Sequence, residues 1–319
     1  MTVPATLNLL VHAVRCEARD VLLIELRDPN GKPLPPFTAG AHLEVYLRDR
    51  LVRHYSLCND PQETHRYCFG VGLARDSRGG SRLIHETLRV GQSLKLSLPR
   101  NNFPLVQSPE ECVFVAGGIG ITPIMSMIRT CLAQGRKWRL YYCTRNRART
   151  AFYEELMALP EMPVQFHFDD EQQGRLFDAA KVLEQVPVDA HVYTCGPEAL
   201  MKAVAAAAAL RPAERMHFEW FSAAPVDTST DREFSLRLVR SGLEFVVPPG
   251  RSILDVLEDH GVGVPWSCRE GLCATCRTDV ISGECDHRDS VLSEAERASN
   301  KSLLVCVSRA RSPVLELDL

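Results

Sequence analysis

The sequence lacks any uninterrupted run of apolar residues as long as the roughly 20 that a membrane-spanning helix needs. It also lacks a basic segment ahead of its first apolar stretch, which is the pattern of a secretory signal. Its formal net charge of -3 over 319 residues provides no basic surface for nucleic acid or an anionic membrane. We therefore expect a cytoplasmic protein that binds neither membranes nor nucleic acid.

Cysteine is plentiful, but the chain does not have the short, disulfide-dense pattern of a small secreted domain. Its 12 cysteines are scattered through 319 residues, so reduced thiols are expected. Four of them differ from the rest by their spacing. Cys268, Cys273 and Cys276 form C-x4-C-x2-C, and Cys306 follows after 29 residues, which is the ligand spacing of a plant-type [2Fe-2S] cluster.

A structural zinc site is the alternative for these cysteines. Such a site usually presents two C-x2-C pairs, whereas this segment has one. Gly271, Ala274 and Thr275 lie between the ligands, and small residues suit a compact loop whose backbone NH groups point at the sulfurs. The spacing favours the iron-sulfur cluster, and we expect Cys285 nearby to be an ordinary thiol.

The order of the expected elements indicates several domains. Short β-like segments separated by Pro and Gly occupy residues 5–105 and predict an antiparallel barrel. Apolar strands then alternate with helical stretches, which predicts a parallel α/β sheet. A small and polar stretch without periodicity indicates a linker, and the remainder predicts a small α+β domain. We place the domains at 1–108, 109–222 and 233–319, with the linker at 223–232.

Two turns in the α/β stretch are typical of a dinucleotide site. In CVFVAGGIGITP a strand leads into a turn with Gly118 and Gly120, where backbone amides can approach a pyrophosphate. In TCGPEALM, Cys195, Gly196 and Pro197 occupy the equivalent place after another strand. Because the carboxyl ends of parallel strands share one edge of a sheet, both turns are expected at one crevice. A buried, purely structural Cys195 is the alternative.

The strand WRLYYCT ends at Thr144 and is followed by Arg145 and two further arginines, where a dinucleotide fold usually has a ribose-binding acid. The arginines either hold a 2'-phosphate and favour NADPH, or form a solvated basic face. Asp169 and Asp170 follow the next strand, VQFHF, and would repel such a phosphate.

Two polar motifs lie in the barrel stretch. RHYSLCND places Arg53 and Tyr55 on one face of an extended segment. RGGS, at residues 78–81, supplies a glycine turn and a hydroxyl suited to a phosphate. Taken alone, the first is equally typical of a polar strand and the second of an ordinary turn.

In the order R-x-Y-S, RGGS, GGIGITP and CGPEALM, these motifs resemble the ferredoxin-NADP reductase superfamily. With the cluster domain at the C-terminus, the whole chain resembles the phthalate dioxygenase reductase family, which includes the reductases of vanillate O-demethylases. The resemblance implies a six-stranded antiparallel flavin barrel, a parallel-sheet NAD domain and an α+β domain of the β-grasp type. It also implies the cofactors FMN, NADH and a [2Fe-2S] cluster, with NADH preferred over NADPH.

The resemblance further assigns roles to residues. The residues implied in flavin binding are Arg53, His54, Tyr55, Ser56, Val71, Gly72, Gly80, Ser81, Thr122 and Phe221. The residues predicted to bind the nucleotide, from the two glycine turns and the end of the WRLYYCT strand, are Gly118, Gly120, Thr144, Arg145, Cys195, Gly196 and Pro197. Thr122 and Cys195 are expected nearest the reaction, at the redox edge of the flavin and beside the nicotinamide. The Phe221 ring is expected to stack on the flavin until NADH displaces it.

The activity that the resemblance implies is oxidation of NADH, with electrons leaving singly through the cluster to a Rieske non-heme iron oxygenase. No side chain needs to act as acid or base, because the cofactors carry the chemistry. A reductase of a cytochrome P450 or di-iron monooxygenase is one alternative. A non-enzymatic redox sensor is another, although no DNA-binding or signalling segment is left over in the chain.

Overall fold

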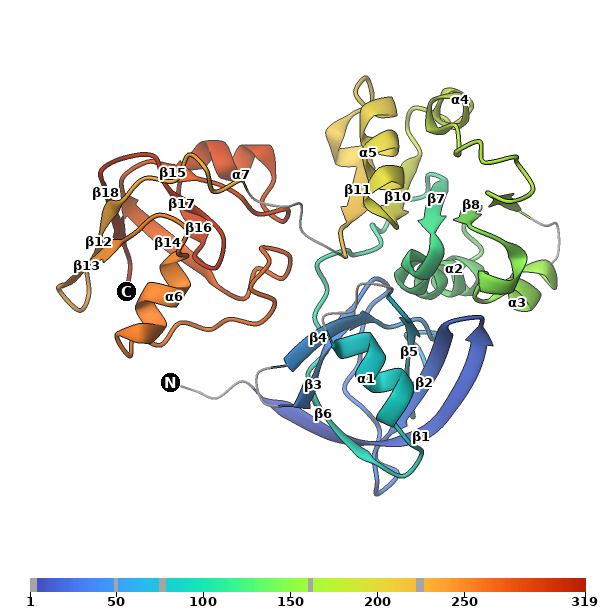
Figure 1. Cartoon of the computed structure of the whole chain (residues 1–319). Coiled ribbons are helices and arrows are strands. Elements are labelled where there is room, and N and C mark those ends of the chain that lie inside the picture. Colours follow the sequence, from blue (N-terminus) through green and yellow to red (C-terminus); the bar gives the residue numbers. More distant parts are fainter. Residues whose placement is uncertain (1–4, 49–50, 75–78, 160–162, 222–226) are drawn as a thin grey trace. The chain divides into compact units, whose positions relative to one another are not determined.

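The computed structural model describes residues 5–48, 51–74, 79–159, 163–221 and 227–319. The chain divides into two compact units, residues 1–221 and 222–319. The first unit contains one antiparallel and one parallel sheet, and the second contains sheets of its own (Figure 1). The domain boundary expected at residue 108 lies within the first unit and stays a prediction.

The first sheet is antiparallel and has six strands in the order β4-β3-β6-β1-β2-β5. Leu57, directly after β4, forms an antiparallel bridge with Phe69 of β5, so the two edge strands meet and the sheet closes into a barrel. The predicted antiparallel barrel is confirmed. Its elements are β1 (Thr6–Ala18), β2 (Val21–Arg27), β3 (His42–Arg48), β4 (Leu51–Ser56), β5 (Tyr67–Gly72), α1 (Gly80–Thr87) and β6 (Ser93–Ser97).

Alternation of apolar side chains along these strands fills the barrel interior. Every second residue along the strand centres points inward, as with Leu43 and Val45 of β3 and Ile24 and Leu26 of β2, and all four are fully buried. Of the RGGS motif, the structure describes Gly79, Gly80 and Ser81, and Gly80 and Ser81 are the first residues of a helix. Gly79 precedes α1 with a φ of 91°. The position favours glycine, because only glycine adopts that conformation without strain.

The second sheet is parallel throughout, in the order β11-β10-β7-β8-β9. Helices alternate with its strands, so the predicted α/β architecture is confirmed. The central strand β7 is buried along its whole length, which explains its continuous apolar sequence. The elements are β7 (Cys112–Gly117), α2 (Ile121–Gln134), β8 (Trp138–Thr144), α3 (Tyr153–Met157), β9 (Val164–Phe168), α4 (Ala179–Glu184), β10 (His191–Cys195), α5 (Glu198–Ala207) and β11 (Met216–Glu219).

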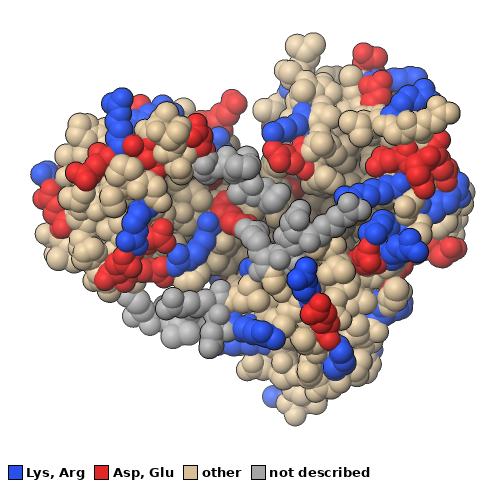
Figure 2. Space-filling view, in the orientation of Figure 1, with Lys and Arg blue, Asp and Glu red and all other residues tan. Residues whose placement is uncertain are grey.

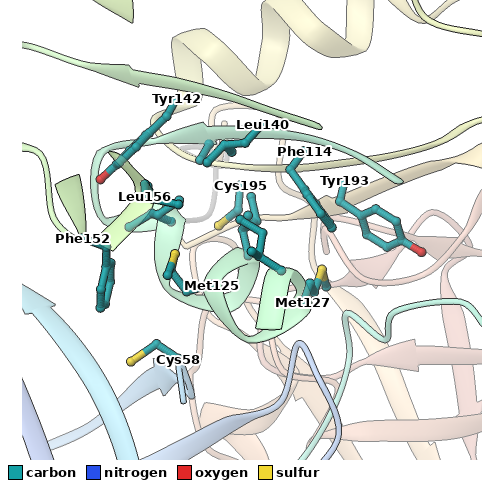
Figure 3. Packing of buried hydrophobic residues seen from close by; sticks show 14 of the residues in the cluster. Cys58, Phe114, Met125, Met127, Leu140, Tyr142, Phe152, Leu156, Tyr193 and Cys195 are labelled. Atoms are coloured by element: carbon teal, nitrogen blue, oxygen red, sulfur yellow. The ribbon is translucent and has the colours of Figure 1, made fainter. Parts of the chain in front are cut away.

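The core of this sheet forms around α2. Figure 3 shows Met127 of α2 near Phe114 and Tyr193, which come from the adjacent strands β7 and β10, and Met125 of the same helix on the side of Leu156 and Phe152. Phe114 and Tyr193 are tilted rings whose centroids lie 5.7 Å apart. Cys58 of the barrel belongs to the same buried cluster, so one continuous apolar core joins the barrel to the parallel sheet.

The second unit is a small α+β domain. Its main sheet has the order β13-β12-β18-β14-β16, in which β12 pairs with β13 as the expected antiparallel hairpin and with β18 in parallel. The expected helix is also present, and Ser252 and Asp255 form a capping box at its start. The elements are β12 (Phe234–Leu238), β13 (Leu243–Val247), α6 (Ile253–Asp259), β14 (Arg277–Ser282), β15 (Cys285–Asp286), α7 (Glu294–Ser299), β16 (Ser302–Leu304), β17 (Arg309–Ala310) and β18 (Val314–Leu317).

One residue of the linker expected at 223–232 is anchored instead. The side chain of Asp231 is 1% exposed, and its carboxylate accepts from Arg288 at 2.7 Å and pairs with Arg309 at 3.4 Å. The Gly250 NH also donates to it at 3.0 Å. Asp231 is therefore part of the second unit, where it provides the counter-charge that two largely buried arginines require. The composition of the segment did not reveal this pairing.

No helix among the described ranges is both long and apolar enough to cross a membrane. Figure 2 shows cationic and anionic side chains interspersed on the visible face of each unit, as a net charge of -3 would suggest.

Substituting Asp231→Asn should strongly destabilise the second unit, because it leaves the buried Arg309 side chain without its counter-charge. We expect a loss of about 3 kcal/mol or more in the free energy of opening β12 and β13, since breaking a buried ion pair from one side costs this much. Hydrogen-exchange mass spectrometry of those strands measures it. Asp227→Asn, an exposed carboxylate in the same segment, is the control, and equal protection in the two variants would contradict the anchor.

Candidate functional site

The two glycine turns of the parallel sheet pack against each other, backbone to backbone. A side chain at Gly117 would lie 2.5 Å from the Pro197 ring, and one at Gly196 would lie 2.8 Å from the Gly117 Cα. A side chain at Gly120 would collide with the Cys195 carbonyl. These contacts follow from the pairing of β7 with β10, in which Cys195 lies opposite Ala116. The sequence prediction that both turns meet at one edge of the sheet agrees with this geometry.

Gly118 is left open beside these contacts. It has a φ of 51°, and a side chain there would meet nothing within 4 Å. The Tyr142 hydroxyl donates to its carbonyl at 3.1 Å and fixes the turn from β8. The turn therefore presents backbone next to open space, which is the arrangement that a pyrophosphate needs.

On the barrel, the predicted phosphate-binding residues also lie together. A side chain at Gly80 would lie 2.6 Å from Cγ and 2.7 Å from Nε of Arg53, so the guanidinium passes directly over the start of α1. The Ser81 hydroxyl accepts from the Ala74 NH at 3.3 Å at the same helix end. An arginine and a helix start beside an open glycine can hold a phosphate.

The other predicted flavin residues line the β4 and β5 side of the barrel. The Tyr55 ring stacks on Phe69 with centroids 5.0 Å apart, and burial raises the pKa of its phenol. His54 stacks on the His42 ring with centroids 5.2 Å apart. The Val71 carbonyl lies 2.9 Å from Nε2 of His85, which fixes the edge of β5.

Thr122 and Gly72 lie where the barrel meets the parallel sheet. A side chain at Gly72 would touch Ile119, and one at Gly70 would lie 2.8 Å from the Thr122 methyl group. The Thr122 hydroxyl donates to the Ile119 carbonyl at 3.0 Å, and the residue is buried. Glycines in β5 thus allow the turn after β7 to approach the barrel wall closely. Phe221 ends the first unit, and 39% of its surface is exposed.

A carboxyl group that the sequence analysis missed joins two of the predicted residues. The Ser56 hydroxyl donates to Oε2 of Glu219 at 3.3 Å, and the Cys195 thiol lies 4.0 Å from the same oxygen. Cys195 and Glu219 are register partners in the parallel strands β10 and β11, so their side chains project side by side. Ser56 is the last residue of β4, which brings the barrel to this point.

Burial controls the protonation of this group. Desolvation raises the pKa of Glu219 to about 8, against a small lowering by the Ser56 hydroxyl, so the carboxyl is largely protonated at neutral pH. Desolvation also raises the pKa of the Cys195 thiol well above its usual range, which makes it a neutral thiol and not a thiolate nucleophile. In the sequence, Glu219 stands between Phe218 and Trp220 and belongs to none of the motifs described above. No local pattern marks this residue, because its position depends on the pairing of β11 with β10.

The four spaced cysteines meet in the second unit. Contacts between the thiols link Cys268 to Cys273 and Cys306, and Cys306 to Cys276. The NH groups of Glu270 and Leu272 donate to the Cys268 sulfur at 3.3 and 3.4 Å, as expected for a loop wrapped around a cluster.

The loop conformation supports the same set of ligands. Gly271 has a φ of 68°, and a side chain there would lie 2.7 Å from Val307, one residue beyond the last ligand. Cys285 lies in β15 as a free buried thiol, and burial raises its pKa to about 11. The residues present therefore fit a four-thiolate cluster, with Cys285 apart from the four linked thiols.

Comparison with known proteins agrees with both units. Residues 114–206 match the model of the oxidoreductase NAD-binding domain, and residues 236–311 match that of the 2Fe-2S iron-sulfur cluster binding domain. The phthalate dioxygenase reductase of Burkholderia cepacia is 45% identical over 95% of this chain and 94% of its own. The chain belongs to the phthalate dioxygenase reductase family.

Other members and structures extend the likeness. The tetrachlorobenzoquinone reductase of Sphingobium chlorophenolicum is 45% identical over 100% of both chains. A solved phthalate dioxygenase reductase, described as modular for electron transfer from pyridine nucleotides to [2Fe-2S], matches 99% of this chain and 98% of its own at 44% identity and a TM-score of 0.74. A type IV self-sufficient cytochrome P450 monooxygenase matches 98% of this chain with a TM-score of 0.90 and 36% identity, but this chain spans only 41% of its length.

The raised pKa of Glu219 predicts a specific pH dependence of stability. The native state keeps a proton that the unfolded chain releases near the ordinary pKa of 4.5, so the stability of the first unit should fall as pH rises toward 8 and then level off. Glu219→Gln removes this slope and should gain stability relative to the unsubstituted protein between pH 5.5 and 8.5. Urea unfolding at those two pH values measures it.

Glu214→Gln is the matched control, because Glu214 is an exposed acid five residues earlier in the chain. A pH-independent difference between Glu219→Gln and the unsubstituted protein would show that this carboxyl is ionised in the folded state.

Proposed function

We propose that the protein is the NADH-dependent electron-transfer reductase of a two-component oxygenase, passing electrons from NADH through FMN and a [2Fe-2S] cluster to a separate Rieske-type oxygenase. The observation that carries the proposal is the meeting of three strand ends in the first unit, those of β4, β10 and β11, at Ser56, Cys195 and Glu219. The same chain provides four linked thiols for a cluster. The family and its two domain matches support this combination of cofactors.

The flavin belongs to the barrel domain, for which we keep the boundaries 1–108. Arg53, with the Gly80 and Ser81 start of α1, would hold the FMN phosphate. Tyr55, Ser56 and the β5 edge at Val71 and Gly72 would line the ring system, with His54 beside them. When bound, the flavin accepts an electron pair as hydride and releases single electrons, which an iron-sulfur cluster can accept.

The nucleotide domain, residues 109–222, would bind NADH across its two turns. Gly118 and Gly120 would present backbone to the pyrophosphate, and the Gly196–Pro197 turn would pack beside it. Thr144 and Arg145, at the end of β8, would lie at the ribose. Cys195 and Thr122 would contact the nicotinamide and flavin edges, and Phe221 would cover the ring until the nucleotide enters.

Beside Ser56 and Cys195, the Glu219 side chain would hold a proton and carry no net charge. The Glu219 carboxyl is protonated at neutral pH, so it can hydrogen-bond the reacting edge without adding a negative charge that would oppose hydride arrival. Ser56 orients this carboxyl through the 3.3 Å hydrogen bond. Cys195 contributes a neutral, polarisable surface.

The acceptor is a protein in this proposal. Cys268, Cys273, Cys276 and Cys306 of the C-terminal domain, residues 233–319, would ligate the cluster. Several full-length relatives carry the names of dioxygenase or demethylase reductases, which favours a Rieske-type partner. The likeness to a P450 monooxygenase favours a haem acceptor as the second candidate. We infer a cytoplasmic location, because 12 cysteines scattered through a long chain are typical of reduced thiols.

Substituting Cys273→Ser should stop electron transfer from the flavin to the cluster and leave reduction of the flavin by NADH intact. We expect NADH-dependent reduction of cytochrome c to fall at least about 100-fold, because loss of a ligand removes the route for single electrons. Reduction of ferricyanide, which the flavin performs directly, should stay within about two-fold. Steady-state assays with both acceptors provide the measurement.

Cys285→Ser is the control, since Cys285 is a buried thiol of the same unit that the structure places outside the four linked thiols. Equal loss of both activities in Cys273→Ser, with an intact Cys285→Ser, would contradict this expectation. Unchanged cytochrome c reduction in Cys273→Ser would exclude the cluster from the electron path.

A further inference from the structure

The segment after β8 lies at the carboxyl end of the strand next to β7. In a dinucleotide fold this is where the adenosine ribose binds, and where a 2'-phosphate would be accepted or rejected. Three arginines occupy it, as a site for the 2'-phosphate of NADPH would require. Two of them are already paired with carboxylates that come from other elements.

Arg147 is held on three sides. Its Nε donates to Oε1 of Glu171 at 2.6 Å and its Nη2 to Oε2 at 3.3 Å, a two-pronged pairing. Its Nη1 donates to the Tyr153 hydroxyl at 3.1 Å, and its guanidinium lies 5.0 Å from the centroid of the Phe168 ring. The pairing with Glu171 raises the pKa of Arg147 and lowers that of the acid. The Arg147 guanidinium is therefore already paired with Glu171 when no nucleotide is bound.

Arg149 is held by the barrel. Its guanidinium pairs with Asp20, which lies in the turn between β1 and β2. The turn is fixed against the arginine segment, because the Arg19 NH donates to the Ala148 carbonyl at 2.7 Å and the Phe152 NH donates to the Glu17 carboxylate at 3.0 Å. A hairpin of the flavin barrel therefore shapes the nucleotide site of the parallel sheet.

The remaining charges near the end of β8 are mostly negative. The Asp169 NH donates to the Thr144 carbonyl at 3.0 Å, and the Asp170 NH donates to the Arg145 carbonyl at 3.2 Å, so both acids follow the same edge. Arg145 is exposed and has no ion pair among the residues that the structure describes. A 2'-phosphate, which carries a charge of about -1.5 to -2 at neutral pH, would meet one available guanidinium and four carboxylates.

We propose that Asp20 and Glu171 determine the choice of NADH over NADPH by engaging Arg149 and Arg147, so that neither guanidinium can bind a 2'-phosphate. This inference rests on the proposed function, since it concerns the nucleotide of the same reaction. This mechanism differs from direct repulsion of the phosphate by Asp169 and Asp170. The Asp20 and Glu171 carboxylates act by pairing with arginines that would otherwise bind the phosphate.

The test compares Asp20→Asn, Glu171→Gln and the double variant in the full-length protein with its cofactors. Each single substitution should raise kcat/KM for NADPH and tighten binding of 2'-AMP about three- to five-fold, since an exposed ion pair of this kind contributes up to about 1 kcal/mol. The double variant should show about the product of the two gains. Binding of 5'-AMP and kcat/KM for NADH should change less than two-fold.

Two controls identify the cause. Glu154→Gln removes an exposed acid of α3 for which the structure describes no ion pair, so it tests a general change of charge and should leave 2'-AMP binding unchanged. Adding Arg147→Gln to Glu171→Gln should abolish the gain, because the released guanidinium is then missing. Isothermal titration calorimetry with 2'-AMP and 5'-AMP reads out binding independently of turnover.

An unchanged ratio of 2'-AMP to 5'-AMP affinity in the double variant would overturn the inference, and so would a gain that persists without Arg147. Failure of the proposed function would look different. In that case the unsubstituted protein would oxidise neither nucleotide, whatever its affinity for 2'-AMP.

Discussion

The close approach of two backbone turns is the constraint on which the first unit depends. β7 and β10 are hydrogen-bonded neighbours, so the turns that follow them must share the space between the Gly117 and Gly196 Cα atoms, and any side chain there would lie within 2.8 Å of the opposite backbone or ring. The register of β10 with β11 places Cys195 beside Glu219, and the glycines of β5 let the turn after β7 approach the barrel. Glycine in both turns and in β5 is therefore a requirement of packing as much as of ligand approach.

Burial then decides the chemistry that this junction can perform. A thiol, a hydroxyl and a carboxyl lie together without a cation among the contacts that the structure describes for them, so the carboxyl stays protonated and the thiol neutral near pH 7. Such a surface neither attacks a substrate nor ionises one, and is suited to holding two ring systems together while electrons move. In the second unit, by contrast, buried groups stay charged. Asp231, near the start of that unit, pairs with the largely buried side chains of Arg288 and Arg309.

Much of this architecture could be predicted from the sequence because it is written in local patterns. Short β-like segments separated by Pro and Gly predicted the barrel, strand and helix alternation predicted the parallel sheet, and the cysteine spacing predicted the cluster ligands. What local patterns could not supply is pairing between distant segments. Glu219 gains its role from a register partner in β10 and a hydroxyl in β4, and Asp231 gains its role from Arg309 nearly 80 residues later. The assigned contacts of individual residues with FMN and NADH stay predictions, since they depend on the bound cofactors.

We propose that electrons enter as a pair from NADH and leave singly through a cluster on the same chain. The most direct measurement is anaerobic addition of one equivalent of NADH to the purified protein, followed by visible absorption and electron paramagnetic resonance. We expect that flavin and iron-sulfur absorption both bleach, and that the signal of a reduced [2Fe-2S] cluster develops. Bleaching of the flavin with no cluster signal, or a colourless protein that contains zinc, would contradict it.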